Sequence, residues 1–232
     1  MRHPNPVIIR NIPRPDAGVL RALLASGVAT VHEAQDRRGL MNSYLRPLHP
    51  RLAVAGPAVT VSCHPGDNLM LHAALEVCRP GDVLVVAPIA PSNHGMFGAL
   101  LGSSCRALGI AGLVIDAGVR DASELIDMRF PVWTKVICPQ GTTKKSAGSV
   151  NVPVTCADEL VFPGDIIVAD FDGVVVVRAG AAADIAKAAE LRHSREQQDR
   201  RRLVAGELTV DLYGFRDKLR ELGVAYIDEF PA

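Results

Sequence analysis

The stretch GIAGLVIDAGVRD, residues 109–121, decides the fold class of this chain. Its central apolar run, LVI, is typical of a buried strand, and the small residues Ala117-Gly118 predict a turn that ends the strand. Arg120 and Asp121 follow that turn. Arginine presents a planar fork to a carboxylate, and aspartate is a hard oxygen ligand for a divalent cation. Such a strand end indicates a site for a metal-bound oxo-acid, although a plain surface Arg-Asp pair would have the same sequence.

The composition favours one α/β domain. Of the 232 residues, 48% are hydrophobic and 4% aromatic, so Val, Leu, Ile and Ala must build a core of buried strands. Basic and acidic residues number 25 each, and this balance predicts no nucleic-acid partner. The lack of a long apolar segment or signal peptide predicts a cytoplasmic protein without membrane contact. Five cysteines without a C-x-x-C pair fit a reducing compartment better than a disulfide framework.

Helices are expected wherever apolar residues recur at helical spacing. Asp16 is expected to cap the first helix and Gly27 to end it. The expected helices lie at residues 15–27, about 28–36, from 66–68 onward, 98–108 and about 181–204. Residues 1–232 are expected to form a single domain, in which 181–232 make a long helix and a C-terminal extension used in subunit contacts.

Strands are expected at three further places. They lie at 52–62, with a break at Gly56-Pro57, at 83–87, and as a pair within 159–178 around an Asp-Gly hairpin. Two similar turns, RPGD at 79–82 and FPGD at 162–165, each precede a strand. They indicate either a weak internal repeat or the same turn chemistry used twice.

Two expected helix starts are candidate ligand sites. Gly98 stands where a helix should begin, so three first-turn amides would lack intrahelical partners and could bind an anion: those of Ala99, Leu100 and Leu101. A simple glycine cap with both leucines in the core is the alternative, and the two interpretations are compatible. Asn68 is either an ordinary capping residue or a hydrogen-bond partner for a metal-bound water.

Charged residues elsewhere leave two interpretations open. Lys144 lies in a polar loop, where it is either solvated or placed to hold a distal carboxylate of an anionic substrate. Glu196 lies in the charged half of the expected helix at 181–204, where a solvated face is the default. Common catalytic motifs such as the P-loop and the nucleophile elbow are absent, and no lysine in an apolar strand suggests a Schiff base. A carbon–carbon lyase built from this chain would therefore use a metal.

Several motifs together resemble the RraA-like family of class II pyruvate aldolases. They are GALL at 98–101, the 109–121 segment, VHEAQ at 31–35, GDNLMLHAA at 66–74 and GFRDKL at 214–219. The chain is most similar to 4-carboxy-4-hydroxy-2-oxoadipate aldolases, also called 4-hydroxy-4-methyl-2-oxoglutarate aldolases. The resemblance covers nearly the whole chain. It implies an α/β protein, a layered sandwich of the swivelling-domain kind with a C-terminal helical extension, assembled as trimers or hexamers with the site between subunits.

The resemblance also implies a metal and its ligands. Mg²⁺ or Mn²⁺ would be held through Asp121 and waters. Arg120 would grip the pyruvyl group, and the substrate-binding segment Gly98–Leu101 would place the amides of Leu100 and Leu101 on its carboxylate.

Three more residues match family positions. Glu196 corresponds to a catalytic acidic residue from a neighbouring subunit, and Asn68 and Lys144 fall at substrate-binding spacings. One position departs from the family pattern, because Ala99 stands where members usually carry Asp or Glu. The missing acid could weaken metal binding, remove a proton relay or shift the reaction.

The expected reaction is the retro-aldol cleavage of a 4-hydroxy-2-oxo diacid. It would release pyruvate together with oxaloacetate or a second pyruvate, and oxaloacetate decarboxylation would be a secondary activity. Two alternatives remain. One is a dedicated oxaloacetate decarboxylase with the same site, and the other is a non-enzymatic regulator of a ribonuclease.

Overall fold

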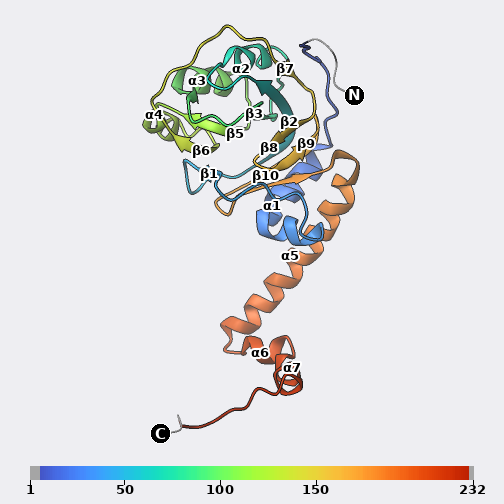
Figure 1. Ribbon diagram of the computed structural model, residues 1–232. Coiled ribbons are helices and arrows are strands. Elements are labelled where there is room, and N and C mark those ends of the chain that lie inside the picture. Colours follow the sequence, from blue (N-terminus) through green and yellow to red (C-terminus); the bar gives the residue numbers. More distant parts are fainter. Residues whose placement is uncertain (1–5, 230–232) are drawn as a thin grey trace. The chain divides into compact units, whose positions relative to one another are not determined.

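A computed structural model describes residues 6–229 of the protein. The chain divides into two compact units between residues 190 and 191. The first unit is a mixed sheet with helices against it, and the second continues the long helix α5 into two short helices (Figure 1). The helices are α1 (Ala17–Ala34), α2 (Leu69–Ala74), α3 (Ala99–Ala107), α4 (Ala122–Asp127), the 3₁₀ turn η1 (Ala179–Ala181), α5 (Ala182–Val204), α6 (Thr209–Leu212) and α7 (Phe215–Glu221).

Within the described residues, the main sheet has nine strands in the order β1-β6-β5-β3-β2-β10-β11, with β4 paired to β5 and β7 to β2. Its centre, β2-β3-β5-β6, is parallel, and β10 and β11 extend it in antiparallel fashion. A separate hairpin joins β8 and β9. The bounds are β1 (Arg46–Pro47), β2 (Val54–Cys63), β3 (Val83–Pro88), β4 (Gly95–Phe97), β5 (Gly112–Val119), β6 (Val132–Ile137), β7 (Ser149–Val150), β8 (Val154–Cys156), β9 (Glu159–Val161), β10 (Ile166–Ala169) and β11 (Val174–Val177).

The central strands are apolar throughout because both of their faces are covered. Along β5, Leu113 and Ile115 join a core that contains residues of α2, α3 and α4, whereas Val114 joins a second core on the opposite face with Trp133 and the β8–β9 hairpin. Strand side chains alternate between faces, so a strand buried on both sides needs a continuous apolar sequence. This architecture confirms the expected α/β sandwich with a C-terminal helix.

The first helix follows its sequence signals. Asp16 caps α1 by accepting a 2.6 Å hydrogen bond from the amide of Gly18. Gly27 takes a positive φ of 77° inside the element, so α1 is two helical segments joined at a kink, as the two expected helices predict. Asp170 caps the second segment, because its Oδ2 accepts a 2.9 Å hydrogen bond from the amide of Val28.

Two expected strand breaks are wrong. β2 runs unbroken through Gly56-Pro57. The amide of Ala58 donates to the carbonyl of Asp165, the residue before β10. Backbone nitrogens alternate in direction along a strand, so the Pro57 nitrogen is on the β3 side, where pairing begins only at Ala58. β5 likewise continues through Ala117-Gly118 to Val119, with a register irregularity against β6. Gly118 serves close packing instead of a turn, since a Cβ there would lie 2.4 Å from the carbonyl oxygen of Asn93.

The RPGD and FPGD turns have the same internal chemistry. In the first, Asp82 accepts the amide of Arg79 at 2.7 Å, and in the second, Asp165 accepts the amide of Phe162 at 3.0 Å. Both aspartates are buried and ion-paired to an arginine elsewhere in the chain. The turn device is thus used twice, once before β3 and once before β10.

The long helix α5 confirms the expected helix at 181–204. Its alanine-rich beginning is packed in the first unit, where Ala182, Ala186 and Ala189 are buried. Among the described residues, no helix combines the length and the apolar character needed to cross a membrane.

Candidate functional site

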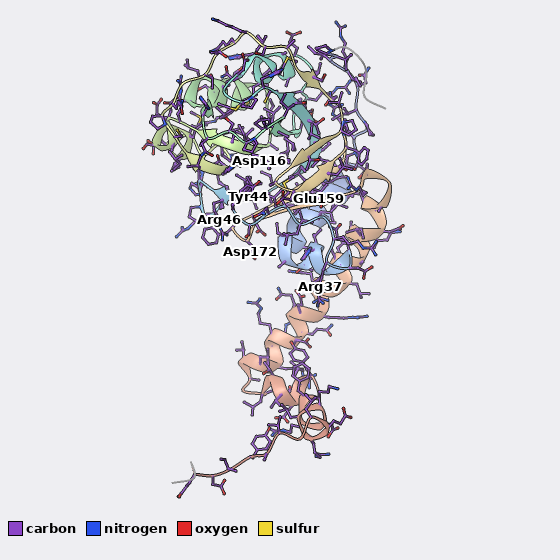
Figure 2. The ribbon with its side chains drawn as sticks, viewed as in Figure 1. Arg37, Tyr44, Arg46, Asp116, Glu159 and Asp172 are labelled. Carbon is purple, nitrogen blue, oxygen red and sulfur yellow. The ribbon has the colours of Figure 1, made fainter. Side chains whose placement is uncertain are left out.

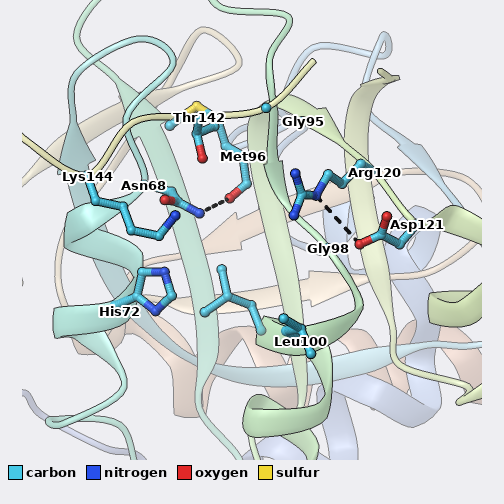
Figure 3. Close-up of a pocket in the computed structure, with 12 residues that line it drawn as sticks. Asn68, His72, Gly95, Met96, Gly98, Leu100, Arg120, Asp121, Thr142 and Lys144 are labelled. Atoms are coloured by element: carbon cyan, nitrogen blue, oxygen red, sulfur yellow. Dashed lines mark hydrogen bonds and ion pairs between the residues drawn. The ribbon is translucent and has the colours of Figure 1, made fainter. Parts of the chain in front are cut away.

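A cavity of about 200 Å³ in the first unit gathers most of the predicted site residues (Figure 3). Its lining comes from the start of α2, from β4 and the start of α3, from the end of β5, and from the loop between β6 and β7. The lining residues are Asn68, His72, Gly95, Met96, Gly98, Leu100, Leu101, Arg120, Asp121, Gly141, Thr142 and Lys144. A cavity of this size suits a small organic acid better than a nucleotide.

The end of β5 supplies the charged pair of the cavity. The amide of Arg120 donates to the carbonyl of Phe97 at 2.9 Å, which ties the strand end to β4. Asp121 has a left-handed backbone with φ of 53° and occupies the N-cap position of α4, yet its side chain makes no cap hydrogen bond there. Its Oδ2 lies instead 3.6 Å from Nε of Arg120 and 3.1 Å from the amide nitrogen of Ala99, which donates to it. The carboxylate is thus turned toward the cavity and away from its own helix.

The N-terminus of α3 faces the same cavity. Gly98 is the extended N-cap of this helix and offers no side chain to cap it. The amides of Leu100 and Leu101 belong to the first turn, where a helix provides no carbonyl four residues back. These donors and the positive helix pole suit a carboxylate. The Leu101 side chain is packed in the core, whereas that of Leu100 is 86% exposed, so the expectation that both leucines are core residues holds only for Leu101.

Two glycines make room for the charged pair. A Cβ at Gly98 would lie 2.4 Å from Oδ2 of Asp121 and 3.0 Å from Cγ of Arg120. A Cβ at Gly95 would lie 3.0 Å from Cβ of Arg120 and 2.3 Å from the carbonyl oxygen of Cys138. Neither glycine has a positive φ in this structure, so both are required by space and not by backbone conformation.

Asn68 contributes an acceptor without a partner. Its Nδ2 donates to the carbonyl of Met96 at 3.0 Å, and the residue is 7% exposed. Within the described part of the chain, its buried Oδ1 has no hydrogen-bond partner. An unpaired buried acceptor is costly, so this atom is suited to a ligand hydroxyl or a bound water. The side chain does not cap α2, so the alternative of an ordinary cap is wrong.

The cavity is dominated by positive charge. Arg120 and Lys144 line it, and Asp121 is the only carboxylate among its described lining residues. Partial burial and then the charge of Lys144 lower the pKa of His72 below its usual value of 6.5. A lining with more positive than negative charge attracts an anion.

Two predicted residues lie apart from the lining. Ala99 is 6% exposed and reaches the site only through its amide. Glu196 belongs to the second unit, where it forms a 2.9 Å ion pair with Arg192 on α5. Its assignment to a neighbouring subunit's site stays a prediction. Asp116 points to the opposite face of β5, where it accepts the hydroxyl of Tyr44 at 2.9 Å (Figure 2).

Sequence reasoning gave no role to five lining residues, His72, Gly95, Met96, Gly141 and Thr142. His72 follows Asn68 by four residues, so helical spacing alone would have placed both on one side of α2. Thr142 and Gly141 lie just before Lys144 in the polar loop, but the sequence has no signal that brings this loop to α2.

A divalent cation fits the residues present if it keeps water ligands. No cluster of three His, Cys, Asp or Glu side chains suited to a metal occurs within residues 6–229, so the protein offers no complete cage. Mg²⁺ commonly takes one or two carboxylates and fills its other positions with water and substrate oxygens. Asp121, whose side chain is 36% exposed, can be that carboxylate, and the free Oδ1 of Asn68 can accept from a bound water.

Comparisons with known proteins show which proteins this chain is similar to. Residues 28–176 match the RraA-like family model, described as Aldolase/RraA. A "Putative 4-hydroxy-4-methyl-2-oxoglutarate aldolase" of Halalkalibacterium halodurans is 29% identical over 183 residues, covering 79% of this chain and 87% of that protein. A protein of the same name from Burkholderia multivorans is 39% identical over 132 residues, covering 57% of this chain and 80% of the relative.

A solved structure gives the same architecture. Streptomyces coelicolor RraAS2, described as an unusual member of the RNase ES inhibitor RraA protein family, superimposes with a TM-score of 0.73 at 32% identity. The match covers 81% of this chain and 98% of the Streptomyces chain. The chain is therefore similar both to proteins named for an aldolase activity and to one named for ribonuclease inhibition.

Proposed function

The chain belongs to the RraA-like family, whose model matches more than half of it, and from this premise we propose that it is a divalent-metal-dependent aldolase. Its substrate would be 4-carboxy-4-hydroxy-2-oxoadipate or 4-hydroxy-4-methyl-2-oxoglutarate. The products would be pyruvate plus oxaloacetate from the first, or two pyruvates from the second. The observation that carries the proposal is the convergence of Arg120, Asp121 and the N-terminus of α3 on one small cavity.

The pyruvyl end of the substrate would bind at the meeting point of β5 and α3. Its carboxylate would accept the amides of Leu100 and Leu101 at the positive helix pole. Arg120 would face the 2-oxo oxygen with a fixed guanidinium. Fixed charge of this kind stabilises an oxyanion without reorganisation during the reaction.

The distal carboxylate would bind between Lys144 and His72. Lys144 supplies the positive charge, and His72, whose pKa is lowered, can gain a proton when an anion arrives. Asn68 would accept a hydrogen bond from the C4 hydroxyl or from a bound water through its free Oδ1. Two anionic groups held at opposite ends would place the C3–C4 bond between them.

Cleavage needs a proton acceptor and a stabilised enolate. The C4 hydroxyl loses its proton, the C3–C4 electrons move onto the pyruvyl fragment, and that fragment gains a proton at C3 to become pyruvate. The positive charge of Arg120 stabilises the negative charge that develops on the 2-oxo oxygen while the bond breaks. When bound at Asp121, Mg²⁺ or Mn²⁺ would supply Lewis-acid charge to the same oxygen. We assign the proton relay to Glu196 of a neighbouring copy, in a homotrimer or homohexamer.

The same enolate chemistry would let the site decarboxylate oxaloacetate as a secondary reaction, because loss of CO₂ from oxaloacetate also leaves the pyruvate enolate. A dedicated oxaloacetate decarboxylase is therefore the nearest alternative. The ratio of kcat/KM for oxaloacetate to kcat/KM for the hydroxy-oxo diacid separates these two assignments.

A test of the proposal is pyruvate release by the purified protein from the two diacids and from oxaloacetate, in EDTA and after Mg²⁺ is restored. We expect metal-dependent release with the diacids preferred. The likeness to RraAS2 favours one other function, regulation of a ribonuclease. Direct binding to a ribonuclease, together with no turnover of any oxo acid, would replace the aldolase assignment with that one.

A further inference from the structure

The carboxylate of Asp67 lies next to the cavity lining and links two parts of the chain that are far apart in sequence. The residue is 2% exposed and does not line the cavity. Its Oδ1 accepts the amide of Leu69, in the first turn of α2, at 3.0 Å. Its Oδ2 accepts three donors from the loop between β6 and β7: the Thr143 hydroxyl at 2.8 Å, the Lys145 amide at 2.7 Å and the Ser146 amide at 2.9 Å.

The two parts that Asp67 joins are neighbouring parts of the cavity lining, across from Arg120 and Asp121 (Figure 3). The α2 side carries Asn68 and His72, and the loop carries Thr142 and Lys144. Two backbone hydrogen bonds lie beside the carboxylate, one from the amide of Asn68 to the carbonyl of Thr143 at 3.1 Å and one in the reverse direction, from the Thr143 amide to Gly66, at 2.8 Å. Between residues 138 and 148 the loop contains no helix or strand beyond a single bridge at Thr143, so its position depends on a few such contacts.

Most of the hydrogen bonds that the Asp67 carboxylate accepts come from the loop. One of its four hydrogen bonds serves α2, and three serve the loop. Burial alone would raise the pKa of Asp67, but hydrogen bonds from Lys145, Leu69, Thr143 and Ser146 outweigh burial and hold the pKa well below its usual range. The group therefore stays ionised, and its hydrogen bonds are charge-assisted and strong.

We propose that Asp67 is a positioning residue of this site, which fixes the loop bearing Thr142 and Lys144 against α2 and so sets where the distal anionic group of a substrate binds. The part that concerns the substrate rests on the function proposed above. The anchoring itself does not, because it is a property of the folded chain and can be measured without turnover.

The anchoring is tested by amide hydrogen exchange in Asp67→Asn. The chain offers a control in Asp165→Asn, because Asp165 is equally buried, at 3% exposed, and accepts two backbone amides and one side-chain donor where Asp67 accepts three and one, in a turn that does not line the cavity. Both variants should lose stability. Only Asp67→Asn should speed exchange at Lys145 and Ser146, by about tenfold or more, the change expected when charge-assisted hydrogen bonds are lost. Unchanged exchange there, or equal acceleration in both variants, would overturn the proposal.

The effect on the substrate is tested by a double-mutant cycle with Lys144→Ala. If Asp67 acts through the loop, Asp67→Asn should raise KM for the diacid about tenfold with a smaller change in kcat, and Lys144→Ala should add little in that background. If the two substitutions instead raise KM by independent factors that multiply in the double mutant, the positioning role is wrong. Should Asp67→Asn fail to fold, Thr143→Val removes one of the three loop bonds and should give the same changes at smaller size. A wild-type protein that cleaves no oxo acid would refute the proposed function, and the exchange result would still decide the anchoring.

Discussion

The amide nitrogen of Ala99 donates a 3.1 Å hydrogen bond to Oδ2 of Asp121, so the first residue of α3 and the residue before α4 meet at the edge of the cavity. This bond orients the carboxylate and leaves α4 without a side-chain cap. It also uses one first-turn amide of α3, so the amides of Leu100 and Leu101 remain to face a ligand. The anion-binding position at the start of α3 is thus built from backbone, and small changes in backbone spacing should affect it strongly.

Gly98→Ala should test the need for space beside this bond. The new Cβ would lie 2.4 Å from Oδ2 of Asp121 and 3.0 Å from Cγ of Arg120, so both side chains must move. A displacement of about 1 Å can cost about 100-fold in rate, and we expect a loss of that order in kcat/KM with the fold retained. Steady-state kinetics and circular dichroism measure the two effects. A variant with wild-type kinetics would show that the Arg120–Asp121 geometry is not limiting.

Ala99→Asp should test the position at which the resemblance to the family leads us to expect an acid. The Ala99 side chain is 6% exposed, and its amide already contacts Asp121. A second carboxylate there would strengthen the attraction for a divalent cation and be favoured by the helix pole, but it would repel Asp121 in the metal-free protein. We expect tighter Mn²⁺ binding by calorimetry and a lower melting temperature in EDTA. Unchanged values for both quantities would mean that the substitution in this chain has no consequence.

Asp121→Asn and Arg120→Lys should separate the two halves of the charged pair. Asp121→Asn should abolish Mn²⁺ binding together with turnover. Arg120→Lys should leave Mn²⁺ binding intact but lower kcat/KM by about 10²–10³-fold, because an ammonium lacks the planar fork. Asp116→Asn is the matched control, since Asp116 lies on β5, the strand that Arg120 and Asp121 follow, and faces Tyr44 on the other side of the sheet (Figure 2). Retained metal dependence in Asp121→Asn would remove Asp121 from the role of ligand.

The parts of this protein that sequence predicts well are those specified locally. Leu113 and Ile115 mark a buried strand because each face of a covered sheet needs apolar residues. The same local logic placed Gly98 before a helix and Gly27 at the end of one, where the structure has the kink in α1. Arg120 and Asp121 could be assigned to a site because they directly follow such a strand.

The parts that escaped prediction depend on contacts between distant residues. Asp67 and Ser146 are 79 positions apart, and no local pattern in either segment predicts their hydrogen bond. From sequence alone, Pro57 predicts a break in the strand because proline has no N–H to donate. The pairing of β2 with β3 begins only at Ala58, so no hydrogen bond is needed from position 57. Gly118 resembles a turn residue for the same reason, because the close approach of Asn93 is a tertiary contact.

The pH dependence of stability should reveal the ionised state of Asp67. Its pKa lies below the unfolded value of about 3.9, so its contribution is complete above that value and is lost as pH falls through the folded pKa. Asp67→Asn should therefore lower the free energy of unfolding by about 2–3 kcal/mol near pH 7 and by about 1 kcal/mol less near pH 3, where the carboxyl is largely protonated in the unfolded chain but still ionised in the folded one. Urea denaturation at the two pH values measures the difference. A gap that is equal at both would mean that folding does not lower the pKa of this carboxyl.

The C-terminal unit should show whether the chain assembles with copies of itself. No described residue from 191 to 229 is buried, and apolar side chains there are exposed, among them Leu222 at 67%, Tyr226 at 74% and Ile227 at 68%. Apolar groups left in water in this number mark an interaction surface, and we expect a second copy to cover them in the homo-oligomer. Light scattering after gel filtration should give a trimer or hexamer for the wild type and a smaller species for Leu222→Asp with Tyr226→Asp. Glu221→Gln, which changes an exposed polar neighbour, should keep the wild-type mass. A wild-type monomer at micromolar concentration would contradict the assembly and also the assignment of Glu196 to a neighbouring site.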